Sequence, residues 1–238
     1  MSTPEQPNEK EGIEKLFNRI APSYDGLNHL FSMHIDRYWR WYAVRGMSRH
    51  EHVLDVAVGT ADLALALLRK GRARQVTGID LSKEMLAIGR QKVQGQPVQL
   101  LLADAQQMPF DDGTFDAVTC GFGVRNFARL DDGLREMYRV LKDGGEMMIL
   151  EFSYPENPLI RRCYEGYLSR VMPFIGSRLS HDKTAFRYLN RSVKTFLWGN
   201  DMVQRLQQAG FCHVTYTPLT FGIATVYRGE KKLKVERS

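Results

Sequence analysis

The chain has 238 residues, of which 43% are hydrophobic and 25% are charged, and its formal net charge is +6. This size suits one α/β domain with an elaboration, and the composition excludes a mostly disordered chain, a collagen-like repeat and a coiled coil. No stretch approaches the roughly 20 apolar residues that a membrane span needs. The polar N-terminus lacks the apolar run of a signal peptide, and the three cysteines are odd in number and far apart. A cytoplasmic protein is therefore expected.

The positive charge is concentrated in particular segments. Residues 161–194 contain eight basic and two acidic residues, so this segment alone carries a charge equal to the net charge of the chain. Residues 36–45 mix arginine with aromatic side chains, and residues 230–238 form a basic tail. Such mixtures stack on nucleic-acid bases, lie at a lipid interface, or simply cover a solvated helix face. Composition alone does not choose among the three.

The N-terminal segment divides into two parts. Residues 1–11 are polar and are predicted to be disordered, whereas residues 12–47 are predicted to form a helical cap. Apolar side chains recur at helical spacing through the cap. Pro22 and Gly26 are expected to break it into short helices.

Strands and helices alternate through the following hundred residues. Strands are predicted at 52–57, 75–79, 98–102, 115–120 and 146–150, and helices at 61–70, 82–93, 131–142 and 200–208. Ser82 is placed to cap the second of these helices. Two β-rich runs, 213–219 and 221–227, are joined so closely that they must pair as an antiparallel hairpin. This order predicts a mostly parallel sheet with helices on both faces and a terminal hairpin.

Polar and small residues stand where the predicted strands end, which is where ligands bind in such a sheet. Gly59 allows close approach of the backbone to a ligand, and Asp80 follows it by 21 residues, a position suited to accepting both hydroxyls of a ribose. Asp104 can accept a hydrogen bond from an exocyclic amine such as that of adenine. Asp55 can bind a cationic amino group or order the loop. Adenine, ribose and an ammonium group together describe S-adenosylmethionine.

Two alternatives stand beside this interpretation. A nicotinamide site of the G-x-G-x-x-G type would need glycine at positions 61 and 64, where the chain has alanine. An aspartate at the end of a strand also often caps the next helix, which is the structural alternative for Asp104.

With these residues in place, the chain resembles the class I S-adenosylmethionine-dependent methyltransferases. Further stretches resemble the ubiquinone/menaquinone biosynthesis C-methyltransferases more closely, from about residue 17 to residue 229. They are Tyr24–Ser32 with Arg37–Trp39, Phe122–Asn126, and Tyr138–Gly145 through Leu150–Ser153. The resemblance implies a Rossmann-like seven-stranded class I methyltransferase sheet in a single domain over 12–229, with an acceptor lid inserted at 154–200.

The resemblance also implies a cofactor site and shows three departures. It assigns to the site Thr60, Asp80, Asp104 with Ala105, and Gly121, beside Asp55 and Gly59, which the ends of the predicted strands already indicate. The turn that is Gly-Gly-Thr-Gly in the family reads Val-Gly-Thr-Ala at 58–61. Asp143 stands where proline is usual, and Gly121, which offers only its backbone, stands where serine is frequent. Cofactor affinity is the property that these departures put in question.

The reaction implied is transfer of a methyl group from S-adenosylmethionine to a ring carbon of a prenylated quinol, with demethylmenaquinol as the expected acceptor. A benzoquinol of ubiquinone biosynthesis, another small molecule and RNA are the alternatives. Carbon becomes nucleophilic when a neighbouring ring hydroxyl loses its proton, so a base or an oxyanion stabiliser is needed.

The family signatures supply the candidates for this role: Tyr24, Asp25, Asn28, His29, Arg125 and Asn126. Arg125 cannot act as a base, because its pKa exceeds 12, but it can stabilise a phenolate or orient a water molecule. Asp25 or His29 can accept the proton, either directly or through that water molecule. The structural alternatives are an ion pair for Arg125 and a core aromatic for Tyr24.

The basic insertion is expected to form a membrane-facing entrance for the quinol. It carries aromatic side chains among its arginines, and His181 and Tyr188 are candidates for the quinol side of the site. Each basic residue near anionic lipid is attracted by about 1 kcal/mol. The expected partners are thus a prenylated quinol and an anionic membrane surface, with no nucleic acid and no metal. The sequence leaves a homo-oligomer open.

Overall fold

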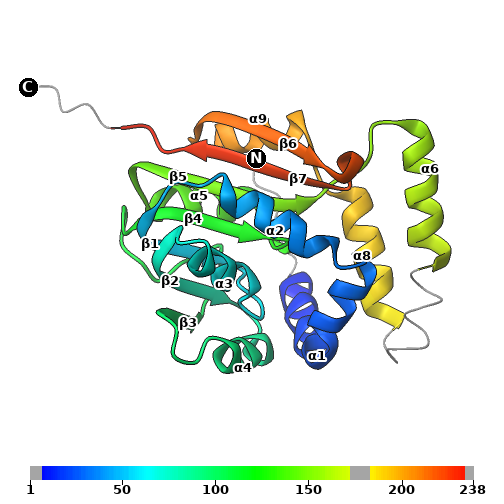
Figure 1. The fold of residues 1–238 in the computed structure, drawn as a ribbon, viewed down its shortest axis with the longest axis horizontal. Helices are drawn as coiled ribbons and strands as arrows, with labels where there is room; N and C mark the ends of the chain where they lie inside the picture. Colours follow the sequence, from blue (N-terminus) through cyan, green and yellow to red (C-terminus); the bar gives the residue numbers. More distant parts are fainter. Residues whose placement is uncertain (1–6, 172–182, 234–238) are drawn as a thin grey trace, which may run out of the picture.

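A seven-stranded sheet organises the protein, and the computed structural model describes residues 7–171 and 183–233 (Figure 1). Its strand order is β3-β2-β1-β4-β5-β7-β6, with β7 antiparallel to both of its neighbours. The strands are β1 (His50–Val56), β2 (Ala73–Asp80), β3 (Val98–Leu102), β4 (Phe115–Gly121), β5 (Leu141–Phe152), β6 (Cys212–Leu219) and β7 (Ala224–Glu230). The mostly parallel sheet and the terminal hairpin are confirmed.

Helices cover both faces of the sheet, and each face has its own apolar core. On one face lie α2 (Ile35–Arg45), α3 (Asp62–Arg69) and α4 (Lys83–Lys92), and on the other α5 (Leu130–Val140) and α9 (Asn200–Gln208) (Figure 1). The last four residues of β1 are all buried, as expected for a parallel strand covered on both sides. Polar residues at the end of such a strand therefore reach a ligand only at the sheet edge.

The cap differs from the prediction. Helix α1 runs without interruption over Pro7–Phe31, so the expectation that Pro22 and Gly26 would divide it into short helices was wrong. It also begins inside the range 1–11 that was predicted to be disordered, of which residues 1–6 lie outside the described residues. Pro22 removes one backbone hydrogen bond, but α1 packs along α4 and is tied to it by side-chain contacts. Tertiary packing thus overrides the local helix-breaking signal.

The insertion after β5 is helical where it is described. It comprises α6 (Pro158–Gly166), the π-helical turn η2 (Tyr167–Val171) and α8 (Lys183–Thr195), while residues 172–182, with His181, lie outside the described part. Tyr164, Leu168 and Val193 form a small core of their own beside the sheet. Within the described ranges, no helix is both long enough and apolar enough to cross a membrane.

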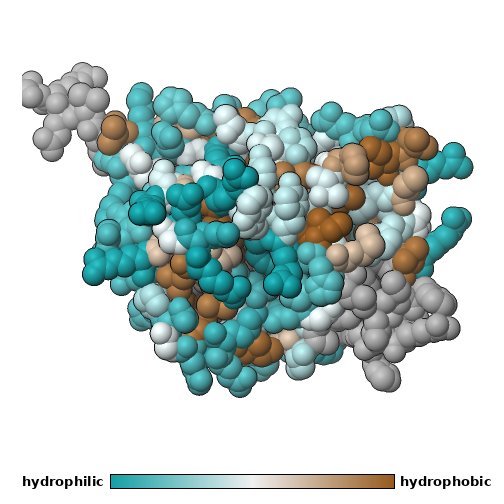
Figure 2. All heavy atoms as spheres, in the orientation of Figure 1, coloured by the Kyte–Doolittle hydropathy of each residue, from teal (hydrophilic) through white to brown (hydrophobic). Residues whose placement is uncertain are grey.

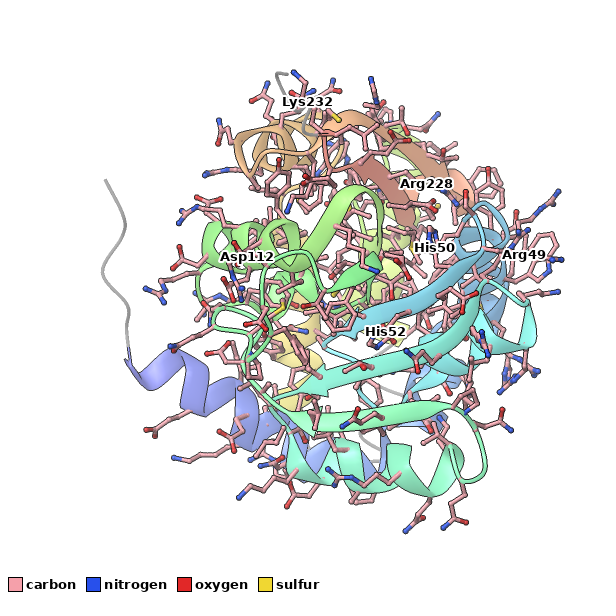
Figure 3. All side chains as sticks on the ribbon, turned by 90° about the vertical axis from the view of Figure 1, so that its left-hand side faces the viewer. Arg49, His50, His52, Asp112, Arg228 and Lys232 are labelled. Atoms are coloured by element: carbon pink, nitrogen blue, oxygen red, sulfur yellow. The ribbon has the colours of Figure 1, made fainter. Side chains whose placement is uncertain are left out.

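The edge where β1 begins carries structural contacts (Figure 3). His50 Nε2 lies 2.9 Å from Glu146 Oε2, and the backbone N–H of His52 donates to Asp116 at 2.8 Å. Arg228 donates to the carbonyl oxygen of Ala43 and so connects β7 with α2. These polar groups join elements at the end of the sheet where β1 begins. A ligand site is therefore expected at the other end, where the parallel strands finish.

Replacing Pro22 by alanine should raise the free energy of unfolding by roughly 2 kcal/mol, because the exposed position regains a helical hydrogen bond and loses the ring clash. Pro158→Ala is the matched control, since Pro158 occupies the first turn of α6, where its missing N–H has no intrahelical partner to lose. Urea denaturation measures both variants. An unchanged or lower stability of the Pro22 variant would show that α1 does not continue through this position.

Candidate active site

The carboxyl ends of β1, β2 and β4 meet where the strand order reverses. Asp55 is the penultimate residue of β1, Asp80 the last of β2 and Gly121 the last of β4. The register pairs Val56 with the residue before Asp80 and with the residue before Gly121, so these positions share one edge. Ligands of doubly wound sheets bind outside such a switch point.

Two cavities lie side by side at this edge. The β2–β3 cavity is lined by Asp80, Asp104 and Ala105, and the β1–β4 cavity by Asp55 and Arg125. The described lining residues common to both are Tyr24, Ala57, Gly59, Gly121 and Phe122. Because the cavities share this wall, an elongated ligand can occupy both.

Asp55 presents an unpartnered oxygen beside the β1–β4 cavity. Its Oδ1 accepts a hydrogen bond from Thr119 Oγ1 at 2.9 Å, whereas its buried Oδ2 has no hydrogen-bond partner among the described residues. Burial raises the pKa of Asp55 to about 7, although the Thr119 hydroxyl and the nearby backbone N–H of Ala64 oppose the shift. A buried oxygen of this kind is costly unless a ligand satisfies it, and a cationic group would do so while favouring the ionised carboxylate.

Asp80 is held rigidly at the mouth of the β2–β3 cavity. The backbone N–H of Gly59 donates to its Oδ2 at 2.8 Å, and that of Ser82 to its Oδ1 at 2.9 Å. Burial raises the pKa of Asp80 even though these hydrogen bonds oppose the shift. Each carboxylate oxygen keeps further acceptor capacity, which suits a pair of ligand hydroxyls. Ser82 also caps α4 by accepting from Met85 N–H, as predicted.

Asp104 orders a turn and does not cap a helix, because no helix lies in the fully described segment between β3 and β4. Its Oδ1 accepts from the backbone and side-chain nitrogens of Gln106, at 2.9 and 3.2 Å, and so orders the turn after β3. It also lines the β2–β3 cavity together with the nearly buried Ala105. The turn therefore fixes the carboxylate at the cavity wall.

The turn after β1 alternates between left-handed and ordinary residues. Ala57, Gly59 and Ala61 have φ angles of +54°, +54° and +68°. This conformation costs a non-glycine residue about 1–2 kcal/mol, so the backbone of Ala57 and of Ala61 is strained. Thr60, between them, donates its hydroxyl proton to Asp25 at 2.6 Å and lines the β1–β4 cavity.

Arg125 forms a buried ion pair that shapes the loop after β4. Its guanidinium lies 2.8 Å from Glu151 Oε1, and the two side chains are 5% and 1% exposed. Nη1 also donates to the carbonyl oxygen of Phe122, and the guanidinium lies over the Phe152 ring. Burial works against the charge, but Glu151 raises the pKa of Arg125 above its ordinary value. The ion-pair alternative is thus realised at a residue that also faces the cavity.

Tyr24 and Asn126 lie at the same junction. Burial raises the pKa of Tyr24, so at neutral pH its phenol is a proton donor and not a base. Asn126 accepts a hydrogen bond from the Tyr188 hydroxyl at 2.9 Å and donates to the carbonyl of Phe122. Asn126 lines the β2–β3 cavity, and its contact with Tyr188 joins the insertion to the β4 loop.

Asp25 and His29, the two proposed proton acceptors, point elsewhere. Asp25 forms an ion pair with Lys92 at 2.9 Å, and His29 Nδ1 lies 2.8 Å from Asp36 Oδ2. Neither side chain is among the described lining residues of the two cavities. Each is engaged in joining the cap to its surroundings, and a role for either as the base, directly or through a water molecule, stays a prediction.

Two residues that shape the site, Glu151 and Phe122, were not predicted from the sequence as site residues. Glu151 was quoted within a motif but given no role, although a carboxylate inside an apolar strand calls for a buried cation. The ring of Phe122 contacts those of Trp39 and Phe152, with centroids 6.0 and 4.6 Å away, and Phe122 lines both cavities. Nothing in the local sequence marks this aromatic cluster, because the three rings come from distant segments.

The fold is shared with solved structures of known and unknown activity. A Thermotoga maritima protein described as an S-adenosylmethionine-dependent methyltransferase, possibly acting on histamine, matches with a TM-score of 0.67 at 20% identity, over 92% of this chain and all of that one. The [4+2]-cyclase SpnF matches with a TM-score of 0.68 at 16% identity, over 98% and 99%. Since a cyclase shares the architecture, the fold alone does not decide the reaction.

Relatives with similar sequences identify the family to which the chain belongs. Demethylmenaquinone methyltransferase of Bacteroides fragilis is 39% identical over 93% of each chain. Ubiquinone/menaquinone biosynthesis C-methyltransferase UbiE of Geobacter sulfurreducens is 43% identical over 94% of this chain and 90% of the relative. A model of the ubiE/COQ5 methyltransferase family matches residues 5–231. The chain belongs to the ubiE/COQ5 methyltransferase family.

Proposed function

We propose that the protein transfers a methyl group from S-adenosylmethionine to a ring carbon of a prenylated quinol, most readily demethylmenaquinol. The observation that carries this proposal is the junction of the two cavities. One is lined by acids suited to an adenosine, and the other is an aromatic cavity that contains a buried guanidinium. The names of the relatives point to the same acceptor class.

The residues present fit S-adenosylmethionine. Asp80 would accept from the ribose hydroxyls and Asp104 from the adenine amine, both in the β2–β3 cavity. Asp55 Oδ2, which lacks a partner among the described residues, would receive the ammonium group in the neighbouring cavity. When bound, this molecule supplies a methyl group already activated on a sulfonium.

The protein then has to align the quinol ring with the methyl group and stabilise the oxyanion of the deprotonated quinol. Phe122 and Tyr24 form the shared wall and would hold the quinol ring against the methyl group, which is catalysis by proximity. The Arg125 guanidinium and the Tyr24 phenol would stabilise the oxyanion that makes the ring carbon nucleophilic. One ring hydrogen is replaced, and its proton leaves to solvent. Deprotonation would run through water, because Asp25 and His29 are engaged elsewhere.

A benzoquinol of ubiquinone biosynthesis is the second candidate acceptor, supported by the name of the Geobacter relative. Aromatic and aliphatic side chains from the insertion and the hairpin line the β1–β4 cavity, including Tyr164, Leu168, Leu189 and Ile223. They offer an apolar environment to either ring and to a prenyl chain. A prenylated quinol resides in a membrane, so we also propose that the enzyme takes its acceptor at the membrane surface.

Asp55→Asn should weaken binding of S-adenosylhomocysteine by roughly 10- to 100-fold, because an amide replaces the charged partner of the ammonium group. Isothermal titration calorimetry measures the effect, with Asp112→Asn on an exposed turn as the matched control. Since the pKa of Asp55 is about 7, wild-type affinity should rise from pH 5.5 to pH 7.5, and this rise should be absent from the Asp55 variant. Equal affinities of wild type and Asp55→Asn would contradict the assigned ammonium site.

Purified protein, S-adenosylmethionine and prenylated demethylnaphthoquinol should give a product heavier by one methyl group, detected by mass spectrometry of the lipid extract. The oxidised quinone is the control and should stay unmethylated, because without a ring hydroxyl no phenolate can activate the carbon. Product from the corresponding benzoquinol alone would favour the second candidate. Failure of both reduced acceptors would refute the proposed function.

A further inference from the structure

A groove between α2 and α3 lies outside both cavities and takes no part in the proposed reaction. Arg37 and Trp41 of α2 line one side, and Arg69 and Lys70 at the end of α3 line the other. The face that carries these helices shows strongly hydrophilic side chains gathered over them (Figure 2). The groove thus corresponds to the basic and aromatic segment 36–45, which the reaction itself does not explain.

Three cations of this groove have no acidic partner. Arg37, Arg69 and Lys70 are exposed, and within the described residues no carboxylate lies at ion-pair distance from any of them. Arg40 behaves differently, because it pairs with Asp36 at 2.7 Å and with Asp62 at 2.9 Å. Uncompensated cations converging on one groove favour an anion such as a phosphate group.

Aromatic side chains stand at the rim of the groove. Trp41 is 37% exposed and Tyr38 is 49% exposed, and their rings stack with centroids 6.0 Å apart. Arg45 lies 4.8 Å from the centre of a Trp41 ring, and Lys70 5.8 Å from it. Tryptophan and tyrosine flanked by cations are typical of the boundary between lipid headgroups and acyl chains.

The groove adjoins the acceptor side of the site. It shares Arg40 and Asp62 with the β1–β4 cavity, so this ion pair forms the wall between groove and cavity. A surface bound at the groove would lie next to the cavity that has to receive an apolar chain. A nucleic acid would match the charge equally well, but it gives no reason for an apolar cavity beside the phosphate site.

We propose that the α2–α3 groove binds the phosphate of an anionic phospholipid and docks the enzyme on the bilayer. Arg37, Arg69 and Lys70 would contact the phosphate, and Tyr38 and Trp41 would enter the interface. This inference rests on the proposed function, because a prenylated quinol acceptor is the reason for docking on a bilayer. Lipid binding and methyl transfer are nevertheless measured separately.

Cosedimentation of the full-length protein with vesicles tests the proposal. Wild type should bind vesicles of phosphatidylcholine mixed with phosphatidylglycerol, release at high salt, and ignore phosphatidylcholine alone. Arg69→Glu combined with Lys70→Glu should lower binding by roughly tenfold or more, because two attractions become repulsions. The control is Arg135→Glu with Arg205→Glu, which makes the same charge change on α5 and α9 of the opposite face and should bind like wild type.

Methylation assays with a soluble and a membrane-embedded quinol distinguish failure of the docking surface from failure of the proposed methyl transfer. The groove variant should methylate a short-chain, water-soluble quinol at the wild-type rate and lose rate only on quinol embedded in anionic vesicles. If neither protein methylates the soluble quinol, the proposed function fails and the vesicle result is judged alone. Equal vesicle binding by wild type and groove variant would overturn the docking surface. Retention of RNA but not of vesicles by wild type would overturn it as well.

Discussion

The ion pair between Arg125 and Glu151 is the constraint on which the site depends. It joins the loop after β4 to the end of β5, two segments that the chain separates by a whole helix, inside a region nearly closed to water. Through the same guanidinium the carbonyl of Phe122 is held in place, and Phe122, which adopts the left-handed conformation, lines both cavities. Removing one partner would leave a buried charge uncompensated, a loss of about 3–5 kcal/mol.

A second set of charges fastens the cap over this site. Arg40 of α2 reaches Asp62 of α3, and Lys92 of α4 contacts both Asp62 and Asp25 of α1. Burial would raise the pKa of Asp62, but Arg40 and Lys92 outweigh it and lower that pKa. The cap thereby supplies Tyr24 to both cavities, while Asp25 and His29 of the family signature form contacts that help to hold the cap in place.

The sequence was sufficient to predict the features that follow from the order of the strands, including the residues at the strand ends. Asp55, Asp80, Asp104 and Gly121 lie together because parallel strands end at one edge, and spacing alone reveals those ends. It was insufficient where distant segments meet. The helix through Pro22 is supported by its contacts with α4, and the pairing of Arg125 with Glu151 depends on packing that no local pattern records. Asp25 and His29 had suitable chemistry, but their orientation was decided by partners elsewhere in the chain.

The central claim is that the two adjoining cavities form one site, in which the donor extends from the β2–β3 cavity to Asp55 and the acceptor occupies the remainder of the β1–β4 cavity. A crystal structure of the complex with S-adenosylhomocysteine tests it most directly. The account predicts the ribose hydroxyls on Asp80, the adenine beside Asp104 in the β2–β3 cavity, and the amino group within hydrogen-bond distance of Asp55 Oδ2. Adenosine bound in the β1–β4 cavity, or an amino group remote from Asp55, would contradict it.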